Sequence, residues 1–201
     1  MQKSHGVKQY VMIALSVLIV GMLGWFVMSY NALVAKEEQV KTAWSQVESN
    51  LQRKVDLLPN LVKVVKRYAA HEKEVFENIA ALRSDALKTL QESQGRADAK
   101  QIKALEQVEQ KLNGSVLKLF AVAENYPQLQ ASEQFMQLQS QIEGAENRIN
   151  ITRMQFNDAV GEFNRYMRTI PANIVASVAG FQRKAYFQAK KQAHRDLKLE
   201  I

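Results

Sequence analysis

Two histidine patterns in this chain of 201 residues are candidates for metal chemistry. His71 opens the stretch HEKEV, but the helix of a zinc protease needs a second histidine four residues later, where this chain has Val75. A di-iron bundle needs a glutamate three residues before each histidine, and the residues at that distance here are Gln, Tyr and Lys. Both patterns fail, so we expect neither a metal nor a cofactor.

A small polar group near the middle of the chain is the next candidate. Arg53 and Asp56 are three residues apart and could pair, and Asn60 follows one turn later. For Asp56 we favour a role as a helix N-cap, with contact to a ligand as the alternative. Trp44 falls in an apolar stripe with Val40 and Val47, which predicts a place in the core. The chain has no Cys and shows no phosphate loop, nucleophile elbow or paired-carboxylate motif, so we expect no enzymatic activity and no small-molecule substrate.

The uncharged run from Gln9 to Ala35 is the strongest feature of the sequence. Roughly 20 apolar residues in a helix cross the hydrocarbon layer of a bilayer. Residues 10–30 therefore predict a transmembrane helix after a short tail, residues 1–9. Aromatic residues of the kind found at membrane interfaces lie toward the ends of this segment: Tyr10, Trp25 and Tyr30. A cleaved signal peptide is the alternative, but the run is too long and lacks a cleavage site, so we expect it to remain as an anchor.

The net charge of +7 lies largely near the C-terminus. The basic residues there are Arg183, Lys184, Lys190, Lys191, Arg195 and Lys198. Basic side chains beside aromatic ones suit anionic lipid, and the alternative is a solvated terminus; we expect no nucleic acid. Lysines on the two sides of the span almost balance, and the short basic N-terminus favours a bundle outside the cytoplasm.

The rest of the chain carries apolar residues every three or four positions, as in bundled or coiled-coil helices. The expected helices are about 31–57, 58–92, 98–126 and 132–170. No stretch alternates with period two, so no strands are expected and the fold class is all-α. Asn113 and Gly114 would ordinarily signal a turn, but the apolar spacing continues through them, which predicts an unbroken helix.

Pro59 interrupts a stretch that is otherwise helical on both sides. A proline inside a helix costs about 3 kcal/mol, whereas in a first turn it costs little. A helix continuing through Pro59 would be far longer than the other helices, whereas a turn makes the four similar in length. We therefore predict a reversal at Pro59 and an antiparallel up-and-down four-helix bundle over residues 31–170. Residues 171–201 form an apolar and then basic tail.

Several stretches of the sequence together resemble the LemA family. They are W-S-x-V, L-Q-R-K-x-D-L-L-P-N-L-V, Y-A-A-H-E, Y-P-x-L, E-N-R-I, F-N-x-A-V and G-F, spread over residues 30–187. The resemblance implies a bacterial single-pass membrane protein with an antiparallel helical bundle, located at the inner membrane. It also implies links to membrane organisation, and no catalytic residues are established for the family.

The expected function is a membrane-anchored scaffold or adaptor that acts through helix association, with a homo-oligomer or another membrane protein as partner. The alternative is an anchored signalling or envelope-stress component. An enzyme is the least favoured class. Candidate structural or interaction residues are Trp44, Arg53, Asp56, Pro59, Asn60 and His71.

The stretch IPANIVASVAGFQRKAYF, residues 170–187, is too short to span a bilayer but suits its surface. We predict that it attaches to the membrane interface or packs on a neighbouring subunit; the alternative is that it covers the end of the bundle. The candidate interface residues are Tyr10, Trp25, Tyr30, Phe181, Arg183, Lys184, Tyr186 and Phe187.

Overall fold

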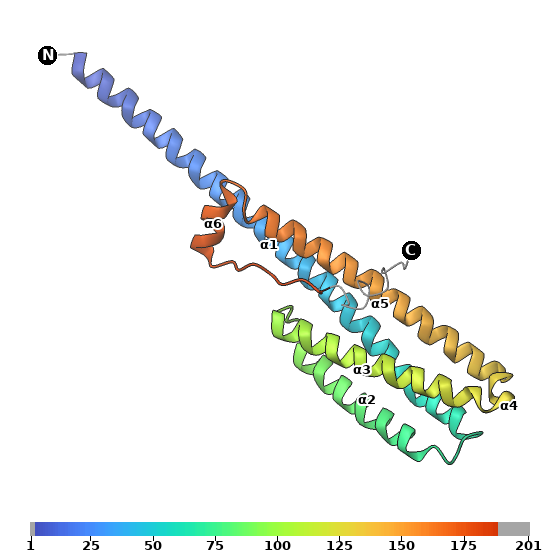
Figure 1. Ribbon diagram of the computed structural model, residues 1–201. Helices are drawn as coiled ribbons and strands as arrows, with labels where there is room; N and C mark the ends of the chain where they lie inside the picture. The colour runs from blue at the N-terminus through green and yellow to red at the C-terminus, as the bar shows by residue number, and fades with distance from the viewer. Residues whose placement is uncertain (1–2, 189–201) are drawn as a thin grey trace, which may run out of the picture. The chain divides into compact units, whose positions relative to one another are not determined.

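The computed structural model describes the backbone of residues 3–188 and the side chains of residues 8–188. Within this range the chain is all-α and has no strand (Figure 1). The helices are α1 (Lys3–Lys66), α2 (Lys73–Ser93), α3 (Ala99–Glu124), α4 (Pro127–Gln130), α5 (Glu133–Tyr166) and α6 (Ala172–Ala179). The expected all-α chain with one long apolar N-terminal helix is confirmed.

Helix α1 is continuous over 64 residues and contains Pro59. The predicted reversal at Pro59, with separate helices over 31–57 and 58–92, is therefore wrong. The apolar stripe keeps its spacing across the proline and is buried at Leu51, Val55, Leu58, Leu61 and Val65, while Pro59 itself is exposed. Burying each of these side chains contributes about 1.5–3 kcal/mol, which together exceeds the cost of about 3 kcal/mol for one proline.

The chain turns instead at residues 67–72, between α1 and α2. The N–H groups of Arg67 and Tyr68 donate to the carbonyls of Val64 and Val65 at 3.2 and 3.0 Å, which tightens the last turn of the helix. Ala69 follows and is fully buried. The six residues of this turn include neither Gly nor Pro, so the sequence carries no conventional turn signal there.

The later helices begin close to where the sequence placed them. The side chain of Asp98 accepts a hydrogen bond from the N–H of Gln101 at 2.9 Å and caps α3. Helix α3 continues through Asn113 and Gly114, as the unbroken apolar spacing predicted. Helix α5 ends at Tyr166, earlier than the predicted 170, and a short turn leads into α6.

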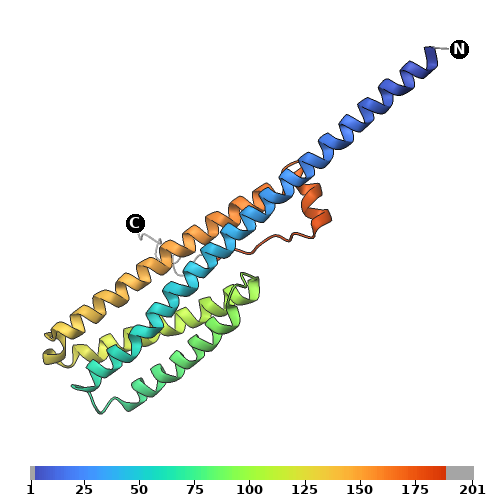
Figure 2. The same ribbon diagram turned by 180° about the vertical axis from the view of Figure 1, so that it is seen from behind.

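The described chain divides into two compact units. Unit 1 holds the residues up to Gln39 together with Gly161–Arg183, and unit 2 holds Val40–Val160 together with the residues from Lys184. In unit 2, α2 and α3 pack side by side as a helical hairpin (Figure 2). Its core contains apolar side chains from α1, α2, α3 and α5, including Trp44, Leu51, Ile79, Leu90, Leu105, Leu119, Ile149 and Phe156.

Unit 1 has a smaller core. Its buried apolar side chains come from α1, α5 and α6 and are Leu33, Phe163, Ala172, Val175 and Ala176.

Candidate functional site

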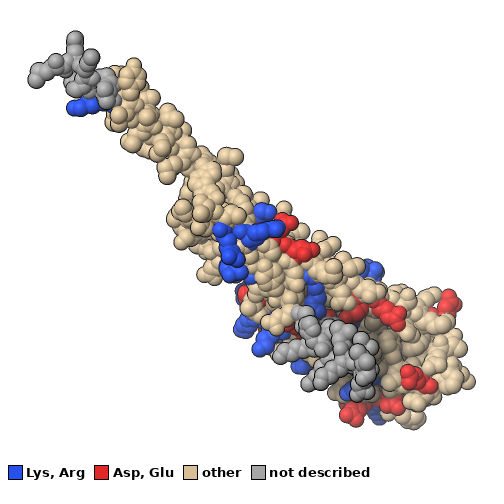
Figure 3. All heavy atoms as spheres, turned by 45° about the horizontal axis from the view of Figure 1, so that its top comes forward, with Lys and Arg blue, Asp and Glu red and all other residues tan. Residues whose placement is uncertain are grey.

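The N-terminal part of α1 presents an uncharged apolar surface, visible as a long stretch without charged side chains in Figure 3. The most apolar stretch of this surface is not buried within the described structure. The exposed large side chains include Val11, Met12, Ile13, Leu15, Val17, Leu18, Ile19, Val20, Met22, Leu23, Val27 and Met28. α1 is thus long and apolar enough to cross a membrane. An exposed apolar surface of this extent needs a partner that excludes water.

An aromatic cluster in unit 1 lies at the end of this surface. Phe181 contacts the ring of Tyr30 at 5.9 Å between centroids and the ring of Phe163 at 6.2 Å. Tyr30 is 42% exposed, whereas Phe163 is fully buried. We call these three residues the outer cluster. Its rings come from α1, from α5 and from the segment after α6.

Helix α6 leaves one apolar face uncovered. Ala172, Val175 and Ala176 are buried, whereas Ile174 and Val178 are 59% and 73% exposed. These two residues are four apart and share a helical face, and Ile170, four residues earlier, is 84% exposed. Gly180 ends the helix in the left-handed conformation, with φ of 76°.

A second aromatic cluster lies in unit 2. The Trp44 ring is 5.4 Å from that of Phe156 and 5.8 Å from that of Phe187, and Phe156 and Phe187 are 5.4 Å apart. We call these residues the inner cluster. Trp44 and Phe156 are fully buried and Phe187 is 6% exposed. The indole N–H of Trp44 also donates to the carbonyl of Ser93 at 3.3 Å.

A carboxylate adjoins the inner cluster. The hydroxyl of Ser93 donates to Glu48 at 2.7 Å. Burial raises the pKa of Glu48, and the hydrogen bonds from Ser93, Gly95 and Trp44 oppose that rise in part. Glu48 thus ties α1 to the end of α2.

Unit 2 also encloses a buried ionic cluster. Lys54 is 1% exposed, and its ammonium group contacts the carboxylate of Glu146 and the side-chain oxygen of Asn113. The amide of Asn113 donates to Glu146 at 3.2 Å. These contacts link α1, α3 and α5, and they provide the opposite charge that a buried ammonium requires.

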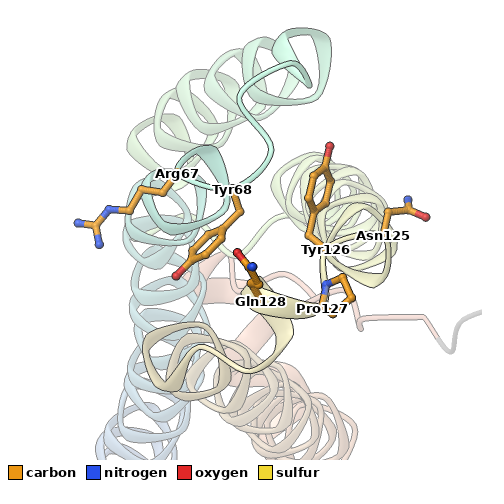
Figure 4. A pocket seen from close by; sticks show the side chains of 6 residues that line it. All are labelled: Arg67, Tyr68, Asn125, Tyr126, Pro127 and Gln128. Atoms are coloured by element: carbon orange, nitrogen blue, oxygen red, sulfur yellow. The ribbon is translucent and has the colours of Figure 1, made fainter.

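An open pocket of about 440 Å³ lies elsewhere in unit 2 (Figure 4). It is formed by the turn after α1, by the connection between α3 and α4 and by the start of α4. Its lining residues are Arg67, Tyr68, Asn125, Tyr126, Pro127 and Gln128. The side chain of Arg67 points away from the others (Figure 4) and donates to Gln134 at 3.3 Å. The pocket therefore offers aromatic and amide surface without a directed charge. No group of three or more His, Cys, Asp or Glu within the described residues could hold a metal.

The profile of the LemA family matches residues 43–200 of the chain. The chain belongs to the LemA family. Its relatives include magnetosome proteins MamQ 1 and MamQ 2 of Paramagnetospirillum magneticum, each 28% identical over 198 residues, which cover 90% of this chain and 73% of the relative. Magnetosome protein MamQ of Magnetospirillum gryphiswaldense is 28% identical over 196 residues, covering 89% of this chain and 72% of the relative.

The LemA match includes both Trp44 and Phe187, and thus the inner cluster, whereas the exposed apolar part of α1 precedes it. The family assignment therefore rests on the folded part of the chain. The apolar surface of α1 is an independent indication of membrane association.

The predicted polar candidates of this LemA-family chain do not form one site. Asp56 lies inside α1 and accepts hydrogen bonds from Gln52 at 3.0 and 3.1 Å, so the predicted N-cap is wrong. Arg53 and Asn60 are also exposed on α1, and His71 is exposed in the following turn. Trp44 is in the core, as predicted.

The predicted interface candidates differ in burial. Four of them are exposed, namely Tyr10, Trp25, Arg183 and Tyr186. Lys184 is half-buried, and Tyr30 and Phe181 belong to the outer cluster. The prediction that Phe187 lies at the membrane interface is wrong, because Phe187 is buried in the inner cluster and contacts protein. The basic residues from Lys190 onward lie outside the described residues.

Sequence reasoning missed the cluster of Lys54, Asn113 and Glu146. Lys54 stands three residues after Leu51 and four before Leu58, which is a stripe position. A lysine within an apolar stripe is the signal that would have indicated a buried ion pair.

Proposed function

We propose that this LemA-family protein is a membrane-anchored helical scaffold or adaptor of the bacterial inner membrane, and that it acts through self-association or association with other membrane proteins. The observation that carries the proposal is the uncharged, exposed surface of α1, which is continuous with a helix of the folded part. Its relatives named magnetosome proteins support membrane association.

The anchor is residues 10–30 of α1 in a single pass. Its length fits a bilayer, since 21 residues at about 1.5 Å each exceed the ~30 Å hydrocarbon thickness. Lys8 and Lys36 flank the uncharged part, and the short basic N-terminus favours a folded part outside the cytoplasm.

The folded part acts as an antiparallel four-helix bundle of α1, α2, α3 and α5. Contacts within unit 2 support this arrangement. Trp44 pairs with Phe156 and Lys54 with Glu146, so residue numbers fall along α5 as they rise along α1. Trp44 also reaches Ser93 at the end of α2, which fits α2 running opposite to α1. A bundle of this kind presents long helical faces to partners.

Helix α6 provides a second attachment, at the membrane interface. Its uncovered face of Ile174 and Val178 is apolar, and Phe181 next to it contacts Tyr30 at the end of the anchor. Arg183 follows and is exposed, as expected for a basic residue at the lipid headgroups.

Depth measurements in lipid test the anchor and the attachment together. The chain lacks Cys, so Val178→Cys can carry the only thiol, labelled with a fluorophore, in the full chain reconstituted into nanodiscs. Lipids with quenchers in the headgroup region should quench this label strongly and should leave a label at Glu143→Cys, exposed on α5, unaffected. Equal quenching at the two positions would reject the attachment.

Two further measurements test the remaining parts of the proposal. Sequencing the N-terminus of membrane-extracted protein should show an uncleaved anchor, and a chain that starts after Tyr30 would reject it. Co-purification of two differently tagged copies from detergent should show self-association.

A second candidate, an anchored component that senses a ligand, rests on the open pocket beside Tyr68 and Tyr126. Substituting both tyrosines with Ala should then abolish a response in cells while membrane insertion and co-purification remain intact.

A further inference from the structure

The last described residues of unit 2 are held within that unit in the manner of a peptide ligand. Residues 184–188, which we call the segment, have no regular secondary structure. Phe187 nevertheless is 6% exposed, because its ring stacks on Trp44 at an interplanar angle of 21° and meets Phe156 edge-on at 74°. One aromatic side chain thus anchors an otherwise irregular segment.

The backbone of Phe187 is hydrogen-bonded at both its N–H and its carbonyl. The N–H of Phe187 donates to the side-chain oxygen of Asn157 at 2.9 Å, and the side-chain amide of Asn157 donates to the carbonyl of Phe187 at 3.2 Å. A carboxamide that satisfies the donor and the acceptor of one residue replaces the pairing that a neighbouring strand would supply. Asn157 therefore fixes the segment by its backbone.

Charged side chains complete the cleft. Arg153 forms ion pairs with Glu109 at 2.9 Å and with Glu106 at 3.4 Å, and its guanidinium lies 4.5 Å from the centroid of the Phe187 ring. Glu106 also accepts a hydrogen bond from the N–H of Gln188 at 3.1 Å. Arg153 is thus held in place over the anchor ring, as in a cation–π contact.

We propose that Trp44, Phe156, Asn157, Arg153 and Glu106 form a binding site for an extended peptide with a phenylalanine anchor, and that its partner is the C-terminal segment of a second copy of this chain. The site recognises the backbone of the peptide and one aromatic side chain. This combination is typical of the recognition of extended peptides.

A second copy is the partner because it carries the same residues that fill the cleft here, and exchange of an identical element is a low-cost route to an oligomer. Release of the segment breaks no helix or strand. Gln182 and Arg183 lie between Phe181 of the outer cluster and the segment, and they are exposed and without regular secondary structure, so the chain can redirect there. Confinement of anchored copies to one membrane raises their effective concentration.

The inference rests on the proposed self-association and gives it a mechanism. It also separates two ways for copies to associate. Contacts between anchors or bundle faces do not need Phe187, whereas exchange of the segment does.

Crosslinking between single-cysteine chains tests the exchange, because the native sequence offers no competing thiol. One copy carries Met154→Cys, at an exposed position of α5 beside Arg153, and a differently tagged copy carries Gln188→Cys. The full chains are co-expressed, purified in detergent and treated with a short bismaleimide. Neither chain can crosslink within itself, so a product that carries both tags joins two copies, and its dependence on Phe187 separates exchange from chance proximity.

We expect a covalent heterodimer that falls at least fivefold when the Gln188→Cys copy also carries Phe187→Ala, or when the Met154→Cys copy also carries Asn157→Ala. Tyr186→Ala, at the exposed neighbouring residue, should leave the yield unchanged. Glu143→Cys, about three turns before Met154 in α5, should give little product in place of Met154→Cys. Circular dichroism of each variant checks that the helices remain folded.

Several results would overturn the exchange. If the two tags co-purify but no heterodimer forms, while both cysteines in one chain crosslink efficiently, the segment binds only within its own chain and the proposed scaffold stands. A heterodimer that is insensitive to Phe187→Ala would show chance proximity. If the tags fail to co-purify and no heterodimer forms, both the exchange and the self-association fail.

Discussion

The outer and inner aromatic clusters take their rings from the same three parts of the chain but differ in their surroundings. Each combines a ring from α1, a ring from α5 and a phenylalanine from the segment after α6: Tyr30, Phe163 and Phe181 in the outer cluster, and Trp44, Phe156 and Phe187 in the inner cluster. The outer cluster leaves Tyr30 42% exposed beside an uncharged surface. The inner cluster is closed and is joined by Asn157, Arg153 and Ser93.

This difference teaches that aromatic clusters built from the same elements can have different surroundings, one beside exposed apolar surface and one enclosed by protein. An exposed ring next to apolar surface suits the lipid interface. A ring whose backbone is also hydrogen-bonded by a neighbouring side chain is positioned for protein recognition. The polar partners, rather than the rings, separate the two roles.

The largest effect should come from truncating the inner cluster. Trp44→Ala removes a fully buried ring and its hydrogen bond to Ser93, so we expect the free energy of unfolding to fall by about 3–5 kcal/mol. Urea denaturation of the full chain in detergent, followed by circular dichroism, measures it. Trp44→Phe should lose clearly less, and a loss below 1 kcal/mol for the alanine variant would contradict a closed core.

A somewhat smaller effect is expected at the buried ionic cluster. Lys54→Met leaves the carboxylate of Glu146 without its ammonium partner. Because that carboxylate side chain is 26% exposed, we expect a loss of about 2–3 kcal/mol rather than the full 3–5 kcal/mol of a wholly buried charge. The double variant Lys54→Met with Glu146→Leu should recover part of the loss in the same denaturation assay. If the double variant recovers no stability, the loss in Lys54→Met comes from the changed packing of the side chain and not from the unpaired charge.

The outer cluster should tolerate truncation better. Tyr30→Ala removes a partly exposed ring and one aromatic pair, so the free energy of unfolding should fall by only about 0.5–1.5 kcal/mol. The same variant should weaken quenching of a label at Val178→Cys by headgroup quenchers. A loss as large as that of Trp44→Ala would show that the two clusters are equivalent and would remove the contrast between them.

The smallest effect is a dependence on pH at Glu48. Burial raises its pKa above the ordinary value of 4.5, so the folded chain holds this proton more tightly than the unfolded chain. The free energy of unfolding therefore decreases as pH rises from about 4.5 through the folded-state pKa.

Glu48→Gln should remove this decrease, as urea denaturation at a series of pH values would show. Glu143→Gln, at an exposed position, is the matched control and should keep it. An unchanged pH profile in Glu48→Gln would assign the dependence to other groups.

Apolar spacing along the sequence predicts the helices correctly. At Asn113 and Gly114 the unbroken spacing correctly outweighed a strong turn signal. At Pro59 the same spacing continues through Leu58, Leu61 and Val65, and their burial keeps α1 continuous, so the reversal predicted from helix length is wrong. A turn without Gly or Pro, such as residues 67–72, depends on which side chains the rest of the fold can bury.

The site was less predictable than the fold because it depends on long-range pairing. Phe187 and Tyr30 are both aromatic residues near basic or apolar neighbours, and local composition gives them the same role. Packing against Trp44 and Phe156 and the hydrogen bonds of Asn157 to its backbone distinguish Phe187 from Tyr30. No spacing along the chain encodes these contacts. The burial of Lys54 could have been predicted from the sequence, because a charged residue there occupies a position of the apolar stripe.

The ionic cluster has a consequence for the chemical ageing of the protein. In a flexible chain, Asn followed by Gly loses ammonia readily, because the glycine N–H attacks the side-chain carbonyl to form a cyclic imide. In α3 the N–H of Gly114 is committed to the helix, and the side chain of Asn113 is held by Lys54 and Glu146. The fold thereby protects Asn113 from deamidation, which would place a second carboxylate beside Glu146. The half-life of the Asn113 amide is then a property of the folded state.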